Sequence, residues 1–256
     1  MKTIIVNNKV LRLYDSIDEM PIVNFQKYNK YVLLDAGLGS DINSVDEHIV
    51  NLARLIKSNA QKASQELQNL RQNMHMIVSE ISPKYMAFAA LIHSIDDKKL
   101  DNLSDDYLKQ VLDEIKEIKH SVIVDFLIWV KKKLAFELET YFPSEFNSAK
   151  EKEVYDKLKQ RTILVLQGIA NDTDTSTEVA DIDSYLFSLY APKSFIGASS
   201  VEIKYDKQFE TTCMLISQKA SMNAKAMTVL EFYNALSNIE KQAEAELKAH
   251  RKALHK

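Results

Sequence analysis

The chain has 256 residues, of which only 4 are glycine and 4 are proline. Average usage would give roughly 30 such residues, so the composition excludes collagen-like, linker-rich and many-turned all-β chains, which need them at turns. The net charge of -3 excludes a surface that acts as a whole as a polycation on nucleic acid or membrane. With 46% hydrophobic residues the chain can bury a sizeable core, and its single cysteine, Cys213, cannot close an intramolecular disulfide.

The N-terminal segment predicts a β-hairpin. Two short apolar, β-branched runs, 3–6 and 9–13, flank Asn7 and Asn8, which tolerate the left-handed backbone of a two-residue turn. An isolated hairpin is only marginally stable in water, so it either lies on the helical body, which we expect, or extends the sheet of a partner. The apolar run at the start is shorter than that of a signal peptide, so we expect the protein to be made and kept in a cytoplasm.

The first half of the chain then carries the signals of helix starts and stops. Pro21 suits a first helical turn, and we expect Gly37 to end that helix in the left-handed conformation. Ser44 and Glu47 have the spacing of a capping box, which predicts a helix start at Ser44. The following signals predict a polar helix over 60–81, a short apolar helix after Ser82-Pro83, a solvated connection or small hairpin over 94–104, and a helix capped by Ser104.

The most apolar window, VIVDFLIWV at 122–130, is followed directly by three lysines. A membrane span needs about 20 apolar residues, and this window is less than half as long and contains Asp125, so we predict no membrane span. We interpret it as a buried helix that runs to Tyr141. The alternative is a segment that anchors a neighbouring subunit, because a helix that is apolar almost all round needs protein on every side.

Pro143 ends this apolar helix and marks the predicted boundary between subdomains. Beyond it, a capping-box spacing at Ser148 and Glu151 predicts a helix to about Ala170. Further patterns predict a helix over 181–190, one short strand over 199–205, a helix over 208–220 and a long final helix from about Asn223.

These elements predict a mainly α fold: a multi-helix, bundle-like body with a short N-terminal β-hairpin and a long C-terminal helix. We divide it into a hairpin arm over 1–14, a helical body over 15–142 and a second helical subdomain over 143–256.

No catalytic or cofactor signature accompanies this fold. The six histidines lack the spacing of a metallopeptidase helix, and the segment 37–40 lacks the Gly-Lys-Ser/Thr ending of a phosphate loop. The segment 172–183 spaces oxygen ligands as a calcium loop does, but Thr177 stands where that loop needs glycine, so we interpret the segment as a polar linker. We therefore predict no cofactor, no metal site and no enzymatic activity. An enzyme that uses a carboxylate or histidine site remains an alternative, because such a site needs no sequence motif.

The sharpest chemical feature is the basic run KAHRKALHK at 248–256. Its cations favour the dipole of a helix C-terminus, so a solvated helix end is the plain interpretation. The functional interpretation is contact with the phosphates of DNA or with an acidic groove of a partner protein, at an affinity that salt weakens. The candidate contact residues are Lys248, Arg251, Lys252 and Lys256.

Two segments carry a resemblance. IDEMPIVNFQKYNKYVLLDAGLGSD, residues 17–41, and MTVLEFYNALSNIEKQ, residues 227–242, resemble helical late-region proteins of crAss-like tailed phages that infect gut Bacteroidetes. That group includes virion components such as head-tail connector and tail-ring subunits and proteins packed in the particle. The resemblance carries no motif from which functional residues transfer.

The resemblance implies a non-enzymatic virion protein that assembles with copies of itself and other virion proteins. It would be made in the cytoplasm of the bacterial host and reside in the virion. Phage connectors and tail rings grip their neighbours with long helices and β-arms, which fits the hairpin and the final helix. An assembly chaperone or scaffold that leaves before the particle matures is the alternative.

Overall fold

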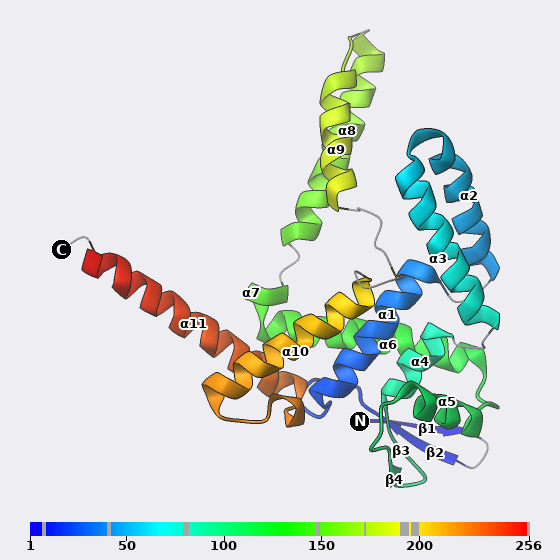
Figure 1. The fold of residues 1–256 in the computed structure, drawn as a ribbon, viewed down its shortest axis with the longest axis vertical. Helices are drawn as coiled ribbons and strands as arrows, with labels where there is room; N and C mark the ends of the chain where they lie inside the picture. The colour runs from blue at the N-terminus through cyan, green and yellow to red at the C-terminus, as the bar shows by residue number, and fades with distance from the viewer. Residues whose placement is uncertain are drawn as a thin grey trace. The chain divides into compact units, whose positions relative to one another are not determined.

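The computed structural model describes residues 1–6, 9–39, 42–78, 82–146, 149–171, 173–189, 195 and 200–254. Most of this part of the chain is helical, and its strands form one small antiparallel sheet (Figure 1). The mainly α fold, the N-terminal hairpin and the long final helix are therefore confirmed.

The sheet joins the N-terminal hairpin to the middle of the chain. Strand β1 (Lys2–Val6) pairs with β2 (Lys9–Leu13), β2 pairs with β3 (Ile92–Ile95), and β3 pairs with β4 (Lys98–Lys99), all antiparallel. The hairpin thus lies on its own body, as expected, because its second strand is hydrogen-bonded within the same chain.

The second hairpin, between β3 and β4, was one of the two outcomes predicted for 94–104. Asp96 and Asp97 form its two-residue turn with φ of 47° and 63°. This left-handed backbone at both positions is what a tight hairpin turn requires, and aspartate tolerates it better than most residues.

Contacts divide the chain into two units, 1–137 with 194–256 and 138–193. The predicted ranges 1–14, 15–142 and 143–256 group the chain differently, because the last two long helices pack with the N-terminal segments. Besides the sheet, the helices that lie wholly in the first unit are α1 (Ile22–Leu38), α2 (Ile42–Ser58), α3 (Ala60–Val78), α4 (Pro83–Ala90), α5 (Asp105–Glu114), α10 (Val201–Ala220), the 3-10 turn η1 (Ala224–Ala226) and α11 (Val229–Leu254).

Helix α1 is central to the first unit and packs against α3, α4, α10 and α11. It buries residues on several faces, and its buried Asn24 donates from Nδ2 to the carbonyl of Ala90 at 2.9 Å. Its polar side chains tie down neighbouring helices as well: Tyr31 donates to Asp105 of α5 at 2.6 Å, and Lys30 contacts Asp206 of α10 at 2.8 Å. Burial together with the hydrogen bond to Asp105 raises the pKa of Tyr31 above its ordinary value.

The apolar window lies in α6 (His120–Tyr141), and only one face of that helix is buried. Ile123, Phe126 and Val130 are buried at helical spacing, whereas Ile128 is 52% exposed and Phe136 is 70% exposed. The interpretation of the window as a wholly buried helix is therefore wrong, and its outer face exposes large apolar side chains among charged ones such as Asp125 and Lys132.

The expected helix stop at Gly37 is also wrong. Helix α1 continues through Gly37 to Leu38, and Gly39, at a φ of 74°, follows it with its N–H donating to the carbonyl of Asp35 at 2.9 Å. A side chain at Gly37 would collide with the ring of Phe195, which fills the space above the glycine. A glycine at position 37 thus leaves room for the ring of Phe195, and Gly39 provides the left-handed residue that ends the helix.

Three helix starts differ from the predictions. Helix α2 begins at Ile42, so Ser44 lies inside it, and α9 begins at Ser176 instead of Asp181. In place of the strand expected over 199–205, residues 201–205 are the start of α10, where the hydroxyl of the capping Ser200 accepts from the N–H of Ile203 at 3.2 Å; Ser199 lies outside the described residues. The serine cap outweighs the alternating pattern, which over so few residues also fits a helix start.

The second unit is mainly a helical hairpin of α8 (Ala149–Asn171) and α9 (Ser176–Leu189), preceded by the short α7 (Pro143–Phe146) (Figure 1). Asp174 accepts from the N–H of Ser176 at 2.9 Å, where α9 begins, and Thr175 donates to the carbonyl of Leu164 at 3.1 Å. Within the stretch interpreted as a polar linker, residues 173–175 are a hydrogen-bonded connection, whereas residues 176–183 are helical, so the linker interpretation is wrong for most of the stretch. Asp172 and the capping residue Ser148 lie outside the described residues.

Candidate functional site

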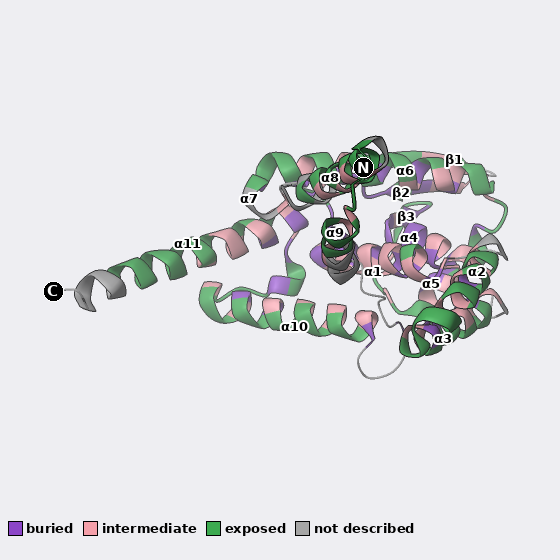
Figure 2. Ribbon diagram, turned by 90° about the horizontal axis from the view of Figure 1, so that it is seen from above, coloured by how far each residue is buried: buried purple, intermediate pink, exposed green. Residues whose placement is uncertain are grey.

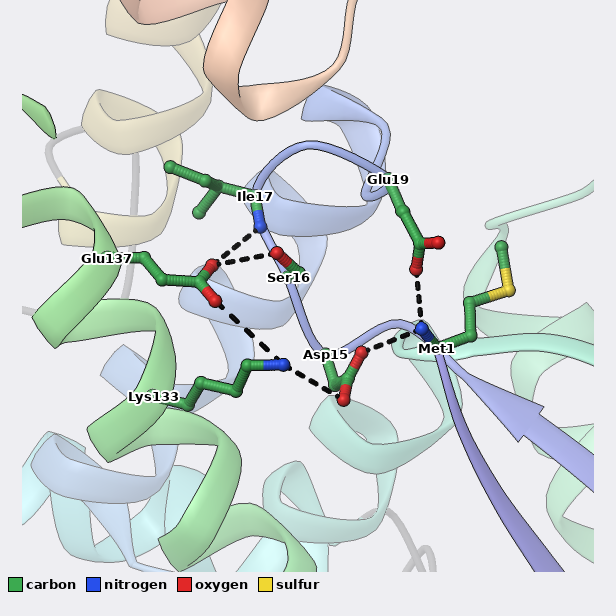
Figure 3. Close-up of polar contacts among 7 residues, drawn as sticks. All are labelled: Met1, Asp15, Ser16, Ile17, Glu19, Lys133 and Glu137. Atoms are coloured by element: carbon green, nitrogen blue, oxygen red, sulfur yellow. Dashed lines mark hydrogen bonds and ion pairs between the residues drawn. The ribbon is translucent and has the colours of Figure 1, made fainter.

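The segment between the hairpin and α1 is held by two side chains of α6 (Figure 3). The carboxylate of Glu137 accepts from the N–H of Ile17 at 2.9 Å and from the hydroxyl of Ser16 at 3.0 Å. The ammonium of Lys133 lies 3.1 Å from the carboxylate of Asp15. Because these contacts all reach residues 15–17, they fix the position of this short segment against α6.

Met1, Asp15, Glu19, Lys133 and Glu137 form one cluster of charged groups, and its contacts favour the ionised forms of Asp15 and of the Met1 amine. Burial disfavours the ionised form of Asp15, but hydrogen bonds from the Met1 ammonium and from Lys133 outweigh burial and hold the pKa of Asp15 below its ordinary value. A hydrogen bond to Glu19, opposed by burial, raises the pKa of the Met1 amine. The two ammonium groups, of Met1 and Lys133, lie among the three carboxylates of Asp15, Glu19 and Glu137, and these contacts hold residues 15–19 in place.

The clamped segment in turn receives the start of α11. Pro21 and Thr228 form an isolated antiparallel bridge, and backbone hydrogen bonds flank it on both sides. Three of these bonds, each of 2.9 Å, run from Val229 to Met20, from Leu230 to Ile17 and from Ile22 to Met227. Residues 17–22 therefore form a platform on which α11 begins.

A capping box fixes the first turn of α11. The N–H of Thr228 donates to the carboxylate of Glu231 at 2.9 Å, and the N–H of Glu231 donates back to the hydroxyl of Thr228 at 3.3 Å. The predicted start at Asn223 is wrong, because Asn223 caps only the short turn η1, with its side chain accepting from Lys225 at 3.2 Å. The Thr-x-x-Glu spacing was readable in the sequence and predicts the correct start.

The first half of α11 is docked on the body. Val229 is 0% exposed and Phe232 is 3% exposed. The ring of Phe232 stacks on Phe209 of α10 at a centroid distance of 6.0 Å, and the ring of Tyr233 meets Phe25 of α1 edge-on at 6.5 Å. Burial raises the pKa of Tyr233 to about 12. These aromatic contacts, each adding to the burial of apolar area, hold this half of the helix.

The second half of α11 is exposed throughout its described side chains (Figure 2). Every residue from 240 to 249 is exposed, and Leu247 is 61% exposed. The apolar positions that begin buried in the body continue at spacings of three and four residues into this half, at Val229, Phe232, Leu236, Ile239, Ala243 and Leu247. One apolar stripe therefore starts in the core and ends at the surface.

A groove of about 420 Å³ lies beside the point where the stripe leaves the core. It lies between the end of α10 and the middle of α11, and the lining is mostly apolar side chains and amides, with Lys219 and Glu231 as its charged members. Met222, from the turn after α10, is 58% exposed there. A neighbouring hollow of about 320 Å³ contains Cys213, and burial raises the pKa of this thiol, which keeps it protonated at neutral pH.

The predicted contact residues lie at the far end of α11. The side chain of Lys248 is 74% exposed and its ammonium lies 3.7 Å from the carboxylate of Glu244, one turn earlier. Arg251 and Lys252 lie on the helical backbone, with side chains outside the described part, and Lys256 lies outside the described residues altogether. That these four residues contact a partner stays a prediction.

Several histidines have structural partners in the first unit, among them His48 and His93. The buried His48 of α2 lies 2.9 Å from Glu66 of α3 through Nδ1 and 3.0 Å from the carbonyl of Leu38 through Nε2, a contact that the sequence did not indicate. His93 of β3 meets the ring of Tyr14 edge-on at 5.3 Å, and burial lowers its pKa. Both histidines join elements of the fold.

Among the residues that the structure describes, no group of three or more histidine, cysteine and acidic side chains is placed to hold a metal ion. None of the described helices has the length and hydropathy of a membrane span. Comparison of the chain with protein-family models, with curated proteins and with solved structures found no significant match.

Proposed function

We propose that the protein is a non-enzymatic structural component of a tailed-phage virion, a head-tail connector or tail-ring subunit that acts by assembling with copies of itself and with other virion proteins. The observation that carries the proposal is the half-docked α11, whose apolar stripe is buried at one end and exposed at the other. The proposed site of synthesis is the host cytoplasm and the proposed site of residence is the particle.

The exposed half of α11 supports an assembly role on energetic grounds. A helical segment that buries nothing gains little stability in water, because most helical stability in proteins comes from packing an apolar face. Beyond the half-buried Ile239, the exposed Ala243 and Leu247 continue the apolar stripe where the body no longer covers it. A surface of this kind indicates a protein partner.

A second apolar surface lies on α6. Ile128 and Phe136 are exposed two turns apart on its outer face, and Trp129, 37% exposed, has the ammonium of Lys2 at 4.0 Å from its ring. A subunit in a ring needs two different faces, one for each neighbour. The outer face of α6 and the exposed half of α11 supply two such candidates within the first unit.

The resemblance to phage proteins supports the particular kind of assembly. It rests on residues 17–41 and 227–242, and these two segments are the ones that the backbone bonds between platform and α11 join. The resemblance therefore concerns one continuous part of the fold, which contains the platform, α1 and the docked half of α11.

Two measurements test the proposal. Light scattering of the purified full chain should give the mass of an oligomer, and mass spectrometry of purified phage particles should detect the chain in a fixed ratio to the capsid protein. Presence in immature particles and absence from mature ones would instead indicate an assembly chaperone or scaffold. A chain that is absent from particles at every stage would overturn the virion role.

A further inference from the structure

The exposed half of α11 carries two oppositely charged stretches on one continuous helix. Residues 240–246 contain three glutamates and one lysine, and residues 248–254 contain three basic residues and no acid. The backbone is helical to Leu254, so both stretches share one axis. Leu247, 61% exposed, lies between them.

We infer that this half of α11 pairs antiparallel with the same half of a second copy of the chain, with Leu247 at the centre of the crossing. In that register residue 240 of one copy faces residue 254 of the other, and 246 faces 248. The acidic stretch of each copy then lies along the basic stretch of its partner. A parallel pair would place acid against acid and base against base, which is unfavourable, so charge selects the antiparallel direction.

Helical spacing places the charges beside the apolar stripe. Glu240 and Glu244 are four residues apart, so they share the flank next to Ala243 and Leu247, and position 251 follows Glu244 by seven residues along the same helical backbone. In antiparallel helices the same flank of each copy meets its counterpart, and this brings position 244 of one helix beside positions 250 and 251 of the other. The small side chain of Ala243 allows close approach of the two helices at this point.

The inference rests on the proposed assembly role and adds the partner and the geometry of one contact. A contact that two copies make with the same surface is isologous and closes a dimer. A larger ring therefore needs a further interface, for which the outer face of α6 is available. The pairing would also neutralise the basic run at the end of α11 with protein carboxylates instead of DNA phosphates.

Charge reversal tests the direction and the partner together. The acidic variant set, Glu240→Lys, Glu244→Lys and Glu246→Lys, leaves no acidic residue in 240–254. The basic set, Lys248→Glu, Arg251→Glu and Lys252→Glu, leaves Lys241 as the one lysine or arginine there. In light scattering of the full chain at low salt we expect each variant alone to dissociate at least tenfold more readily than the parent. An equimolar mixture of the two variants should recover the parent mass.

A matched control reverses charges elsewhere on the same unit. Lys204 and Lys207 are exposed on α10, so the variant Lys204→Glu with Lys207→Glu should keep the parent mass. If both α11 variants also keep the parent mass, or if their mixture stays dissociated, the inference is wrong while the assembly role stands. If the basic-set variant keeps its mass but loses binding to double-stranded DNA, the run acts on DNA and the inference is overturned.

A cysteine probe tests the centre of the crossing. Leu247→Cys should form a disulfide-linked dimer when the full chain is oxidised with copper phenanthroline, because the two copies of residue 247 meet at the twofold axis. Lys241→Cys, also exposed but six residues from the crossing and about 120° from Leu247 around the helix, is the matched control and should stay monomeric on a non-reducing gel. Equal cross-linking at both positions would overturn the proposed register.

Discussion

The two halves of α11 share one helix and one apolar stripe, but they differ in what surrounds them. In the first half Phe232 is 3% exposed and stacks on Phe209 of α10, whereas in the second half Leu247 is 61% exposed. The spacing of apolar residues is equally regular in both halves. The periodicity of apolar residues therefore predicts which face of a helix packs against other protein. It does not predict whether that protein surface belongs to the same chain or to another one.

The largest expected effect on the free energy of unfolding comes from truncating a buried side chain in the docked half of α11. Phe232→Ala should lower the free energy of unfolding by about 3–5 kcal/mol, because it removes buried ring contacts and leaves a cavity. Urea denaturation at low protein concentration measures the loss. The matched control in the exposed half, Leu247→Ala, should change the same quantity by less than about 0.5 kcal/mol. Similar losses at both positions would contradict the difference between the halves.

Loosening the platform should have the next largest effect. Asp15→Asn removes the charge that pairs with Lys133 and should cost about 2 kcal/mol at neutral pH, since hydrogen bonds to charged groups are among the stronger ones. The dependence on pH sharpens this prediction. The folded pKa of Asp15 lies below its ordinary value, so the stabilisation is complete above the unfolded pKa of about 3.9. It is lost as the pH falls through the folded pKa.

The parent chain and Asp15→Asn should therefore converge in stability as the pH is lowered from 5 toward 2, and chemical denaturation at each pH measures the gap. Asp105 serves as the comparison, because burial opposes its ionisation but hydrogen bonds from Lys27 and Tyr31 hold its pKa below the ordinary value. Its contribution should disappear in the same acidic range in both proteins. A gap between parent and Asp15→Asn that stayed constant with pH would show that the carboxylate charge is not what stabilises the platform.

A smaller effect is expected where the docked half begins. Thr228→Ala removes one of the two hydrogen bonds of the capping box and should cost about 1 kcal/mol in thermal or urea unfolding. Thr228→Ser keeps the hydroxyl and should retain most of the stability. If serine and alanine proved equally destabilising, the lost methyl group and not the cap would be responsible.

The smallest effect on folding should come from the exposed end. Deletion of residues 248–256 should leave the free energy of unfolding within about 0.5 kcal/mol of the parent, because the described side chains there are exposed. The same deletion should weaken association with a partner in a salt-dependent manner, which light scattering at two salt concentrations would detect. Unchanged association would mean that the basic run is only a solvated helix end.

Local signals in the sequence predicted most of the elements. Asn7 and Asn8 between β-branched runs predicted the hairpin, and Ser104 was correctly placed as the cap of α5, accepting from Tyr107 at 3.4 Å. Gly37 misled because two glycines stand close together and only the tertiary contact of Gly37 with Phe195 distinguishes them. The alternating run 199–205 misled because it was too short to separate a strand from a helix start.

The candidate site was predictable only in part. The stripe of α11 and its basic end were visible as patterns along one segment. The platform was not, because it depends on backbone bonds between Ile17 and Leu230 and on the reach of Glu137 from α6, which are matters of tertiary structure. Every residue except proline carries the same backbone N–H and C=O groups whatever its side chain. A hydrogen bond between distant backbone groups therefore leaves no pattern in the sequence that predicts it.

The separation of platform and α11 along the chain has a consequence for synthesis. The ribosome releases residues 17–22 long before residues 227–230, so the carbonyls of Ile17 and Met20 remain without their donors through most of translation. Contacts between such distant segments form late. The exposed half of α11 follows the docked half immediately, so a nascent chain presents this surface only after the segments that complete its body have been made. A chain truncated before the docked half therefore also lacks the exposed half, so it cannot present this surface without the segment that completes the body.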